Sequence, residues 1–158
     1  MALLEQGQLP LVEEGLAGLL QQGIAAERLR FTTDNVQAVA QADFTFLCGR
    51  TPQQQDGRAD VEYVERVAGE IGGHLAAESV VISKSAVPVE SARVAKRVLG
   101  RSDVAVVSDL DFLREGSAVH DFVHSDRIVI GADDDATAIR AARGSPLSAA
   151  RVRQAGAQ

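Results

Sequence analysis

The residues best suited to chemistry lie in one short loop that contains Arg114, Glu115 and Gly116. The apolar run VAVVS at 104–108 precedes this loop, and RIVIG at 127–131 follows it, so both flanks are predicted strands. In an open α/β sheet, a loop that follows a buried strand presents its polar groups to a ligand. The simpler alternative is an ordinary turn that begins a helix, in which the dipole favours Glu115.

Two other groups of side chains suggest reactivity but favour a structural role. His120 and His124 share one face of a predicted helix, near Asp121 and Asp126, which is a spacing that metal sites use. Such a cluster without a second ligand segment usually arises by chance on a surface, so we expect no metal. Cys48 lies in an apolar run and is expected to be an inert core thiol.

The elements that position these residues alternate between strands and helices. Val12, Leu16, Leu19 and Leu20 share one helical face, and Gly23 is expected to end that first helix. The repeated units imply right-handed crossovers and a mostly parallel sheet. Helices are predicted over 12–22, 35–42, 61–75, 90–100, 119–124 and from 134, and strands over 29–33, 43–49 (fully buried), 79–83, 104–108 and 127–131.

Length and composition exclude several classes of protein. The 158 residues suffice for one domain. A net charge of −6 argues against nucleic acid or a membrane surface as a partner. The sequence has no apolar run long enough for a membrane span and no signal-peptide pattern. A single cysteine fits a reducing compartment, so we expect a cytoplasmic protein.

Three ordered motifs link the chain to a known family. TPQQQDGRAD at 51–60, KSAVPVESA at 84–92 and DLDFLREGSA at 109–118 resemble the T-P turn, the K-S-T-V-P-V-G-T segment and the N-P-E-F-L-R-E-G-x-A loop of the UDP-glucose/GDP-mannose dehydrogenase family. The N-terminal VEEGL resembles the family's Y-E-P-G-L, with Val12 in place of tyrosine and Glu14 in place of proline. The resemblance covers approximately residues 3–140.

The resemblance implies an incomplete doubly wound (Rossmann-like) α/β fold, with a mostly parallel sheet and helices on both faces. Residues 1–140 are expected to form a partial NAD-binding domain, and residues 141–158 a disordered tail. Family members begin with a strand and a G-x-G-Y-V-G turn, but this sequence contains no G-x-G-x-x-G. The family's cysteine nucleophile lies in a second domain that this sequence does not match. We therefore expect a truncated relative.

The family oxidises the 6-hydroxyl of a UDP-sugar to a carboxylate and reduces two NAD. By resemblance, Thr51 lies near the nicotinamide-side ribose and Glu115 contacts the cofactor. Ala86 stands where the family has a threonine that holds cofactor and catalytic water, so that hydroxyl is lost. Asp111 matches the glutamate that orients water, although its side chain is one methylene shorter. Lys84 matches the lysine of K-S-T, although by itself it is equally compatible with a solvated loop cation.

The same loop is implied to bind the substrate. The backbone of Phe112, Leu113 and Arg114 is expected to cradle the UDP-sugar, between Asp111 and Glu115. Asp121 and Asp126 are implied to have structural roles.

These observations leave alternatives open. We expect no turnover by the chain alone and weak or undetectable NAD binding. The chain is either a dehydrogenase fragment, a non-catalytic nucleotide-sugar-binding or interaction module, or a gene remnant. The run at 43–49 contains no lysine or proline and is expected to be an exposed sheet edge through which the chain self-associates.

Overall fold

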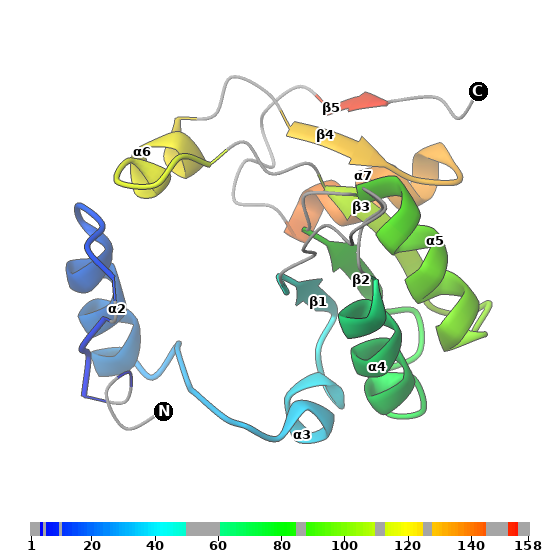
Figure 1. Cartoon of the computed structure of the whole chain (residues 1–158), viewed down its shortest axis with the longest axis horizontal. Coiled ribbons are helices and arrows are strands. Elements are labelled where there is room, and N and C mark those ends of the chain that lie inside the picture. Colours follow the sequence, from blue (N-terminus) through cyan, green and yellow to red (C-terminus); the bar gives the residue numbers. More distant parts are fainter. Residues whose placement is uncertain are drawn as a thin grey trace. The chain divides into compact units, whose positions relative to one another are not determined.

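The computed structural model describes residues 4, 6–9, 11–49, 61–84, 88–109, 113–124, 128–144 and 152–154 (Figure 1). The chain divides into two compact units. Unit 1 consists of Met1–Asp34 and Phe112–Ser125, and unit 2 consists of Asn35–Asp111 and Asp126–Gln158. The predicted domain over 1–140 thus draws on both units.

Unit 2 is built on a five-stranded sheet with the order β1-β2-β3-β4-β5. β1, β2 and β3 run parallel, as their predicted crossovers require. β4 is antiparallel to β3 and parallel to β5. The strands span Phe44–Leu47 (β1), Val80–Ser83 (β2), Ala105–Asp109 (β3), Ile128–Gly131 (β4) and Val152–Gln154 (β5).

The reversal between β3 and β4 follows from the path of the chain. After Asp109 the chain enters unit 1, and it returns to the sheet only for β4. The register pairs Ser108 with Gly131 and Asp109 with Ile130, so β4 starts beyond the carboxyl end of β3 and runs back along it. A mostly parallel sheet with one antiparallel pair results.

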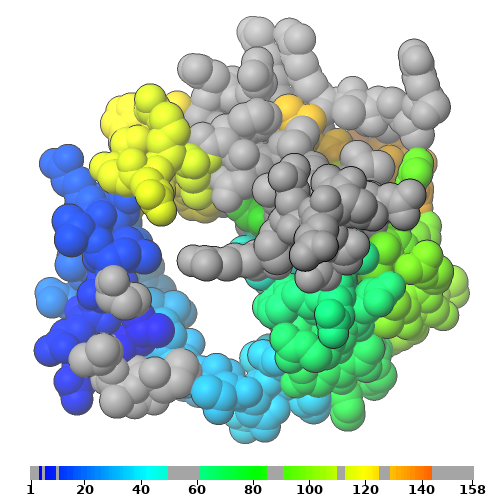
Figure 2. Space-filling model, in the orientation of Figure 1, coloured from blue at the N-terminus to red at the C-terminus, as the bar shows by residue number. Residues whose placement is uncertain are grey.

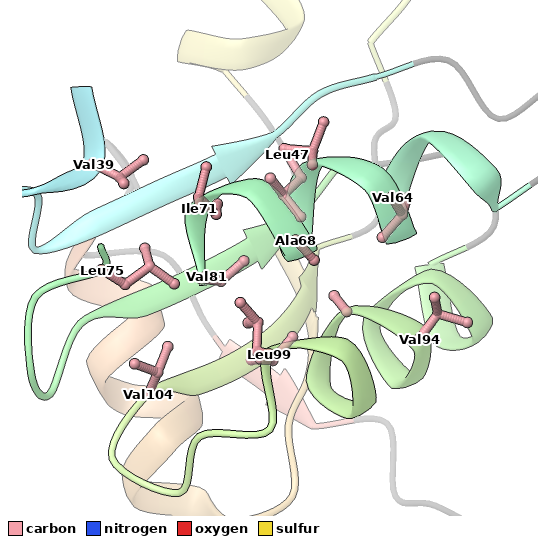
Figure 3. Packing of buried hydrophobic residues seen from close by; sticks show 13 residues of the cluster. Val39, Leu47, Val64, Ala68, Ile71, Leu75, Val81, Val94, Leu99 and Val104 are labelled. Atoms are coloured by element: carbon pink, nitrogen blue, oxygen red, sulfur yellow. The ribbon is translucent and has the colours of Figure 1, made fainter. Parts of the chain in front are cut away.

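One face of the sheet is covered by α3, α4 and α5, which span Asn35–Val39, Glu62–Ile71 and Pro88–Leu99. Leu47 of β1, Val81 of β2 and Ile71 of α4 converge in this layer (Figure 3). Complete burial of such a side chain stabilises the fold by roughly 1.5–3 kcal/mol. α4 and α5 lie side by side on the surface of unit 2 (Figure 2).

The opposite face is covered by α7, Asp135–Gly144. Val80, Ile82 and Val107 alternate with the residues of the first face and pack here against Ala138 and Ala141 of α7. The predicted helices on both faces of a mostly parallel sheet are therefore confirmed. The four valine, isoleucine and serine residues of β2 are buried throughout, as a central parallel strand requires.

Local sequence signals account for several helix boundaries. The predicted spacing of Val64, Val67 and Ile71 is confirmed, because all three are buried on one face of α4. Gly100 ends α5 with a left-handed φ of 60°, which glycine adopts without strain. Asp134 caps α7, since its Oδ1 accepts a hydrogen bond of 2.8 Å from the N–H of Thr137.

The N-terminal predictions require correction. The first helix, α2, spans Leu16–Ala25, so it begins later than predicted, and Val12 lies outside it with 98% exposure. Gly23 lies inside α2, and its missing Cβ admits the side chain of Leu29. The helix ends instead where Glu27 takes a left-handed φ of 55°.

The predicted strand over 29–33 is wrong. This segment has no strand pairing among the described residues, and it belongs to unit 1, whereas the sheet belongs to unit 2. Alternating apolar and polar side chains favour a strand, but a strand also needs a hydrogen-bonded neighbour.

The predicted strand at 43–49 forms, but it is not fully buried. In the described part of the chain, β1 pairs only with β2 and so lies at the sheet edge. Phe46 is 41% exposed, and Cys48 is exposed and not a core thiol. Within the described residues, the run thus forms the exposed sheet edge that was expected of it, whereas the expectation of full burial is wrong.

The C-terminal segment contains structure where the sequence predicts disorder over 141–158. α7 continues to Gly144, and β5 pairs with β4 at Ile128↔Val152 and at the next two positions. Within the described ranges, no helix is both long and apolar enough to cross a membrane.

Candidate functional site

The loop that follows β3 is organised around Asp121, which lies on the short helix α6, Ala118–Val123, in unit 1. The guanidinium of Arg114 donates from Nε to Oδ2 at 3.0 Å and from Nη2 to Oδ1 at 2.7 Å. The backbone N–H of Arg114 and the hydroxyl of Ser117 also donate to Oδ2, both at 3.1 Å. Asp121 thus fixes the loop at three points, in agreement with its expected structural role.

This network changes the electrostatics of its members. The hydrogen bonds from the Arg114 side chain are the main cause that holds the pKa of Asp121 far below its ordinary value. The same pair raises the pKa of Arg114. Because the Arg114 side chain binds Asp121, its guanidinium acts as an anchor of the loop.

A second anchor comes from the N-terminal segment of unit 1, Met1–Asp34. The carboxylate of Glu13 accepts hydrogen bonds from the backbone N–H of Gly116 at 2.9 Å and of Val119 at 3.4 Å. Glu13 was not predicted as a site residue, because more than a hundred residues separate it from the loop. One sequence feature marks Glu13: it matches the glutamate of the family segment Y-E-P-G-L.

His120 of α6 and His124, the residue that caps its C-terminus, pack against each other. Their rings stack with centroids 4.5 Å apart, and Nδ1 of His124 lies 3.2 Å from the backbone oxygen of His120. Asp126 lies outside the described residues. Among the residues that are described, no group of three or more histidine, cysteine or acidic side chains could hold a metal ion.

In unit 2, a charged pair lies at the carboxyl ends of two neighbouring parallel strands. Nζ of Lys84, which follows β2, lies 3.3 Å from Oδ2 of Asp109, the last residue of β3. Their side chains are only 16% and 11% exposed. The alternative of a solvated loop cation is therefore wrong for Lys84. The sequence analysis did not single out Asp109, which stands at the asparagine position of N-P-E-F-L-R-E-G-x-A.

The structure describes only part of the predicted site. Leu113, Arg114 and Glu115 are all exposed in unit 1. Lys84 belongs to unit 2. Four predicted residues lie outside the described part of the chain: Thr51, Ala86, Asp111 and Phe112.

Among the described residues, none forms a cradle for the pyrophosphate of NAD. A dinucleotide needs a glycine turn at a strand end, where bare backbone N–H groups approach the phosphates. The printed sequence has no G-x-G-x-x-G. At the carboxyl end of β1, the ring of Tyr63 packs on the Cα of Gly49 so closely that an added Cβ would overlap it. The ring of Tyr63 therefore occupies the space where the Cβ of a larger residue would lie at position 49.

Comparison with known proteins agrees with the motifs. The sequence profile of the UDP-glucose/GDP-mannose dehydrogenase family, NAD binding domain, matches residues 1–145. UDP-glucose 6-dehydrogenase of Rhizobium meliloti is 44% identical over 138 residues, which cover 84% of this chain and 32% of that protein. GDP-mannose 6-dehydrogenase of Pseudomonas putida is 36% identical over 146 residues, or 85% of this chain and 33% of the relative.

A solved structure agrees as well. The crystal structure of a ternary complex of GDP-mannose dehydrogenase from Pseudomonas aeruginosa superposes with a TM-score of 0.83 at 32% identity, over 97% of this chain and 38% of the other. This chain thus spans about a third of the length of the curated relatives that it matches. With a family profile over nearly its whole length, the chain belongs to the UDP-glucose/GDP-mannose dehydrogenase family, within its NAD-binding domain.

Proposed function

We propose that this chain supplies the nucleotide-sugar loop of a UDP-glucose 6-dehydrogenase-like protein. The whole enzyme would act in the cytoplasm, where it oxidises the 6-hydroxyl of a UDP-sugar to a carboxylate with NAD as oxidant. The observation that carries this proposal is the doubly anchored loop, because side chains of the chain itself, Asp121 and Glu13, hold Arg114 and Gly116. A loop fixed before binding loses little conformational freedom when a ligand arrives.

In this proposal, the backbone of the loop does the binding. The side chain and the backbone N–H of Arg114 bind Asp121 and so fix the path of the exposed segment 113–115, along which we propose that the sugar nucleotide lies. Asp111 is proposed to orient a water molecule, at a reach one methylene shorter than that of the family's glutamate. We propose Thr51 and Glu115 as residual cofactor contacts.

We propose that the chain has no turnover by itself. Ala86 lacks the hydroxyl that the family's threonine provides, and none of the described residues forms a cradle for the pyrophosphate of NAD. Loss of one hydrogen bond to a charged or polarised group costs about 1.5–3 kcal/mol. We therefore assign no step of the oxidation to this chain alone and expect NAD binding to be weak or undetectable.

Calorimetric titration of the purified chain with UDP-glucose, UDP and NAD tests these statements. We expect saturable binding of UDP-glucose at one site per chain and no resolvable heat with NAD. No binding of either UDP ligand would refute the proposed function. A steady NADH signal with UDP-glucose and NAD, above the no-enzyme control, would refute the proposed inactivity.

A second proposed property is self-association through residues 43–49. β1 lies at the sheet edge of the described chain, Phe46 is 41% exposed, and the segment carries no lysine or proline. Edge strands of this kind are templates for pairing with another chain. Light scattering should report a dimer or larger species, and Phe46→Lys should shift it towards monomer. A wild-type monomer at micromolar concentration would contradict the proposal.

A further inference from the structure

Glu13 joins two segments that are far apart in the sequence. Its Oε2 accepts from Gly116 at 2.9 Å and its Oε1 from Val119 at 3.4 Å, across 103 and 106 positions. All three residues belong to unit 1. Both donors are backbone groups of the loop and of α6, so one side chain determines the path of the main chain at two points.

The second contact fills a gap at the start of α6. The first N–H groups of a helix have no partner inside it, and an N-cap side chain usually accepts from one of them. Ser117 occupies the N-cap position, but its side chain makes no cap hydrogen bond. Its hydroxyl donates to Asp121 instead. Glu13 therefore caps the helix at Val119 in place of the local residue.

The first contact holds a residue with an unusual backbone. Gly116 has a φ of 85°, a conformation that side-chain-bearing residues rarely adopt. Such a position is open to several conformations unless an outside contact selects one. The Glu13 carboxylate provides that contact, next to Glu115 and two residues from the Arg114 anchor.

The two anchors bind different residues of the loop. Asp121 binds the N–H and side chain of Arg114, whereas Glu13 binds Gly116 and Val119. Local sequence supplies the first anchor, because Asp121 lies only seven positions from Arg114. Only the distant Glu13 supplies the second.

We propose that Glu13 is the positioning residue of the nucleotide-sugar loop. It is not catalytic, since it acts through the main chain of Gly116 and Val119. That UDP-glucose is the ligand rests on the proposed function. The positioning of the loop by Glu13 does not depend on any ligand. Loss of the carboxylate should weaken UDP-glucose binding because it releases the loop, while the core of unit 2 stays intact.

Three variants of the full chain test the proposal: Glu13→Ala, Glu13→Gln and the matched control Glu14→Ala. Glu14 is the exposed neighbour with the same charge, whereas Glu13 is half-buried. Amide exchange followed by NMR should accelerate at Gly116 and Val119 in Glu13→Ala by on the order of tenfold, the effect of one charge-assisted hydrogen bond. The dissociation constant for UDP-glucose should rise by a similar factor, and Glu14→Ala should match wild type in both measurements.

The glutamine variant separates positioning from general damage. Its amide retains one acceptor oxygen, so it should keep the shorter bond to Gly116 and lose the longer one to Val119. Protection should therefore persist at Gly116 and fall at Val119, a split that unfolding of unit 1 cannot produce.

The remaining outcomes are decisive. Unchanged exchange at both amides in Glu13→Ala would overturn the proposal. Released amides with unchanged UDP-glucose affinity would overturn it as well. If wild type itself fails to bind UDP-glucose, the proposed function fails, and faster exchange in Glu13→Ala would still support Glu13 as the residue that positions the loop.

Discussion

The loop in unit 1 and the sheet in unit 2 are held by different forces. The loop depends on a few directional contacts, in which Asp121 and Glu13 bind Arg114 and Gly116 close to solvent. The sheet depends on apolar side chains such as Ile71, packed on both faces and almost fully excluded from water. Hydrophobic burial is non-directional, whereas hydrogen bonds fix geometry. The stability of the sheet and the geometry of the loop thus depend on separate residues, which mutations can address one at a time.

The largest expected effect lies in the apolar core. Ile71→Ala should lower the free energy of unfolding by about 2–5 kcal/mol, because Ile71 is 1% exposed and leaves a cavity. The control Ile139→Ala, on α7 and 55% exposed, should change it by less than about 0.5 kcal/mol. Urea unfolding monitored by circular dichroism measures both. Equal effects of the two substitutions would show that the core is not packed as described.

The charged pair at the strand ends should have an intermediate effect. Lys84→Met removes the ammonium beside the partly buried Asp109 and should cost about 1.5–3 kcal/mol. Lys84→Met combined with Asp109→Leu should recover part of this loss, because no carboxylate then lacks its cation. A double-mutant cycle in urea quantifies the coupling. Strict additivity would mean that the pair does not interact in solution.

A smaller effect should appear in the loop as pH changes. The folded-state pKa of Asp121 lies below its ordinary value, chiefly because of the Arg114 side chain. The contact therefore contributes stability above the ordinary aspartate pKa, and this is lost only as pH falls through the lower folded value. NMR titration should show the Arg114 Nε–H signal unchanged while exposed carboxylates protonate. Titration of Asp121 together with those carboxylates would contradict the structure.

The smallest effect is expected for an ion pair on the outer surface of unit 2. Arg97 Nη2 lies 3.3 Å from Glu65 Oε1 with side chains 70% and 46% exposed, so solvent screens the pair. Arg97→Ala should leave the free energy of unfolding within about 0.5 kcal/mol of wild type. Urea unfolding at low and high salt provides the comparison. A large, salt-dependent loss would mean that surface charges stabilise the sheet more than its apolar faces suggest.

Periodic apolar patterns predicted the core well. The spacing of Val64, Val67 and Ile71 indicated α4, and the apolar run at 79–83 indicated the strand β2. These patterns are local and repeat over several residues, because burial of one face selects apolar side chains at a regular spacing. The segment at 29–33 was predicted incorrectly, because its pattern says nothing of whether a neighbouring strand exists.

The site was less predictable because its contacts are single and distant. The resemblance indicated Asp121 as structural, and its partner Arg114 lies nearby in the sequence. Nothing in the local sequence of Glu13 indicates that it binds Gly116. Asp109 ends a strand, and only the parallel pairing of β2 with β3 brings it next to Lys84.

The interrupted path of unit 1 has a consequence for synthesis on the ribosome. Its two segments, Met1–Asp34 and Phe112–Ser125, are separated in the chain by Asn35–Asp111 of unit 2. At about 5–20 residues per second, translation of that intervening stretch takes on the order of 4–15 s. During this interval the carboxylate of Glu13 has neither of its amide partners, because Gly116 and Val119 have not yet been made. The earlier of the two segments therefore acquires these contacts only after the later one has been made, and a chaperone that binds short apolar segments has time to reach α2 before Glu13 binds the loop.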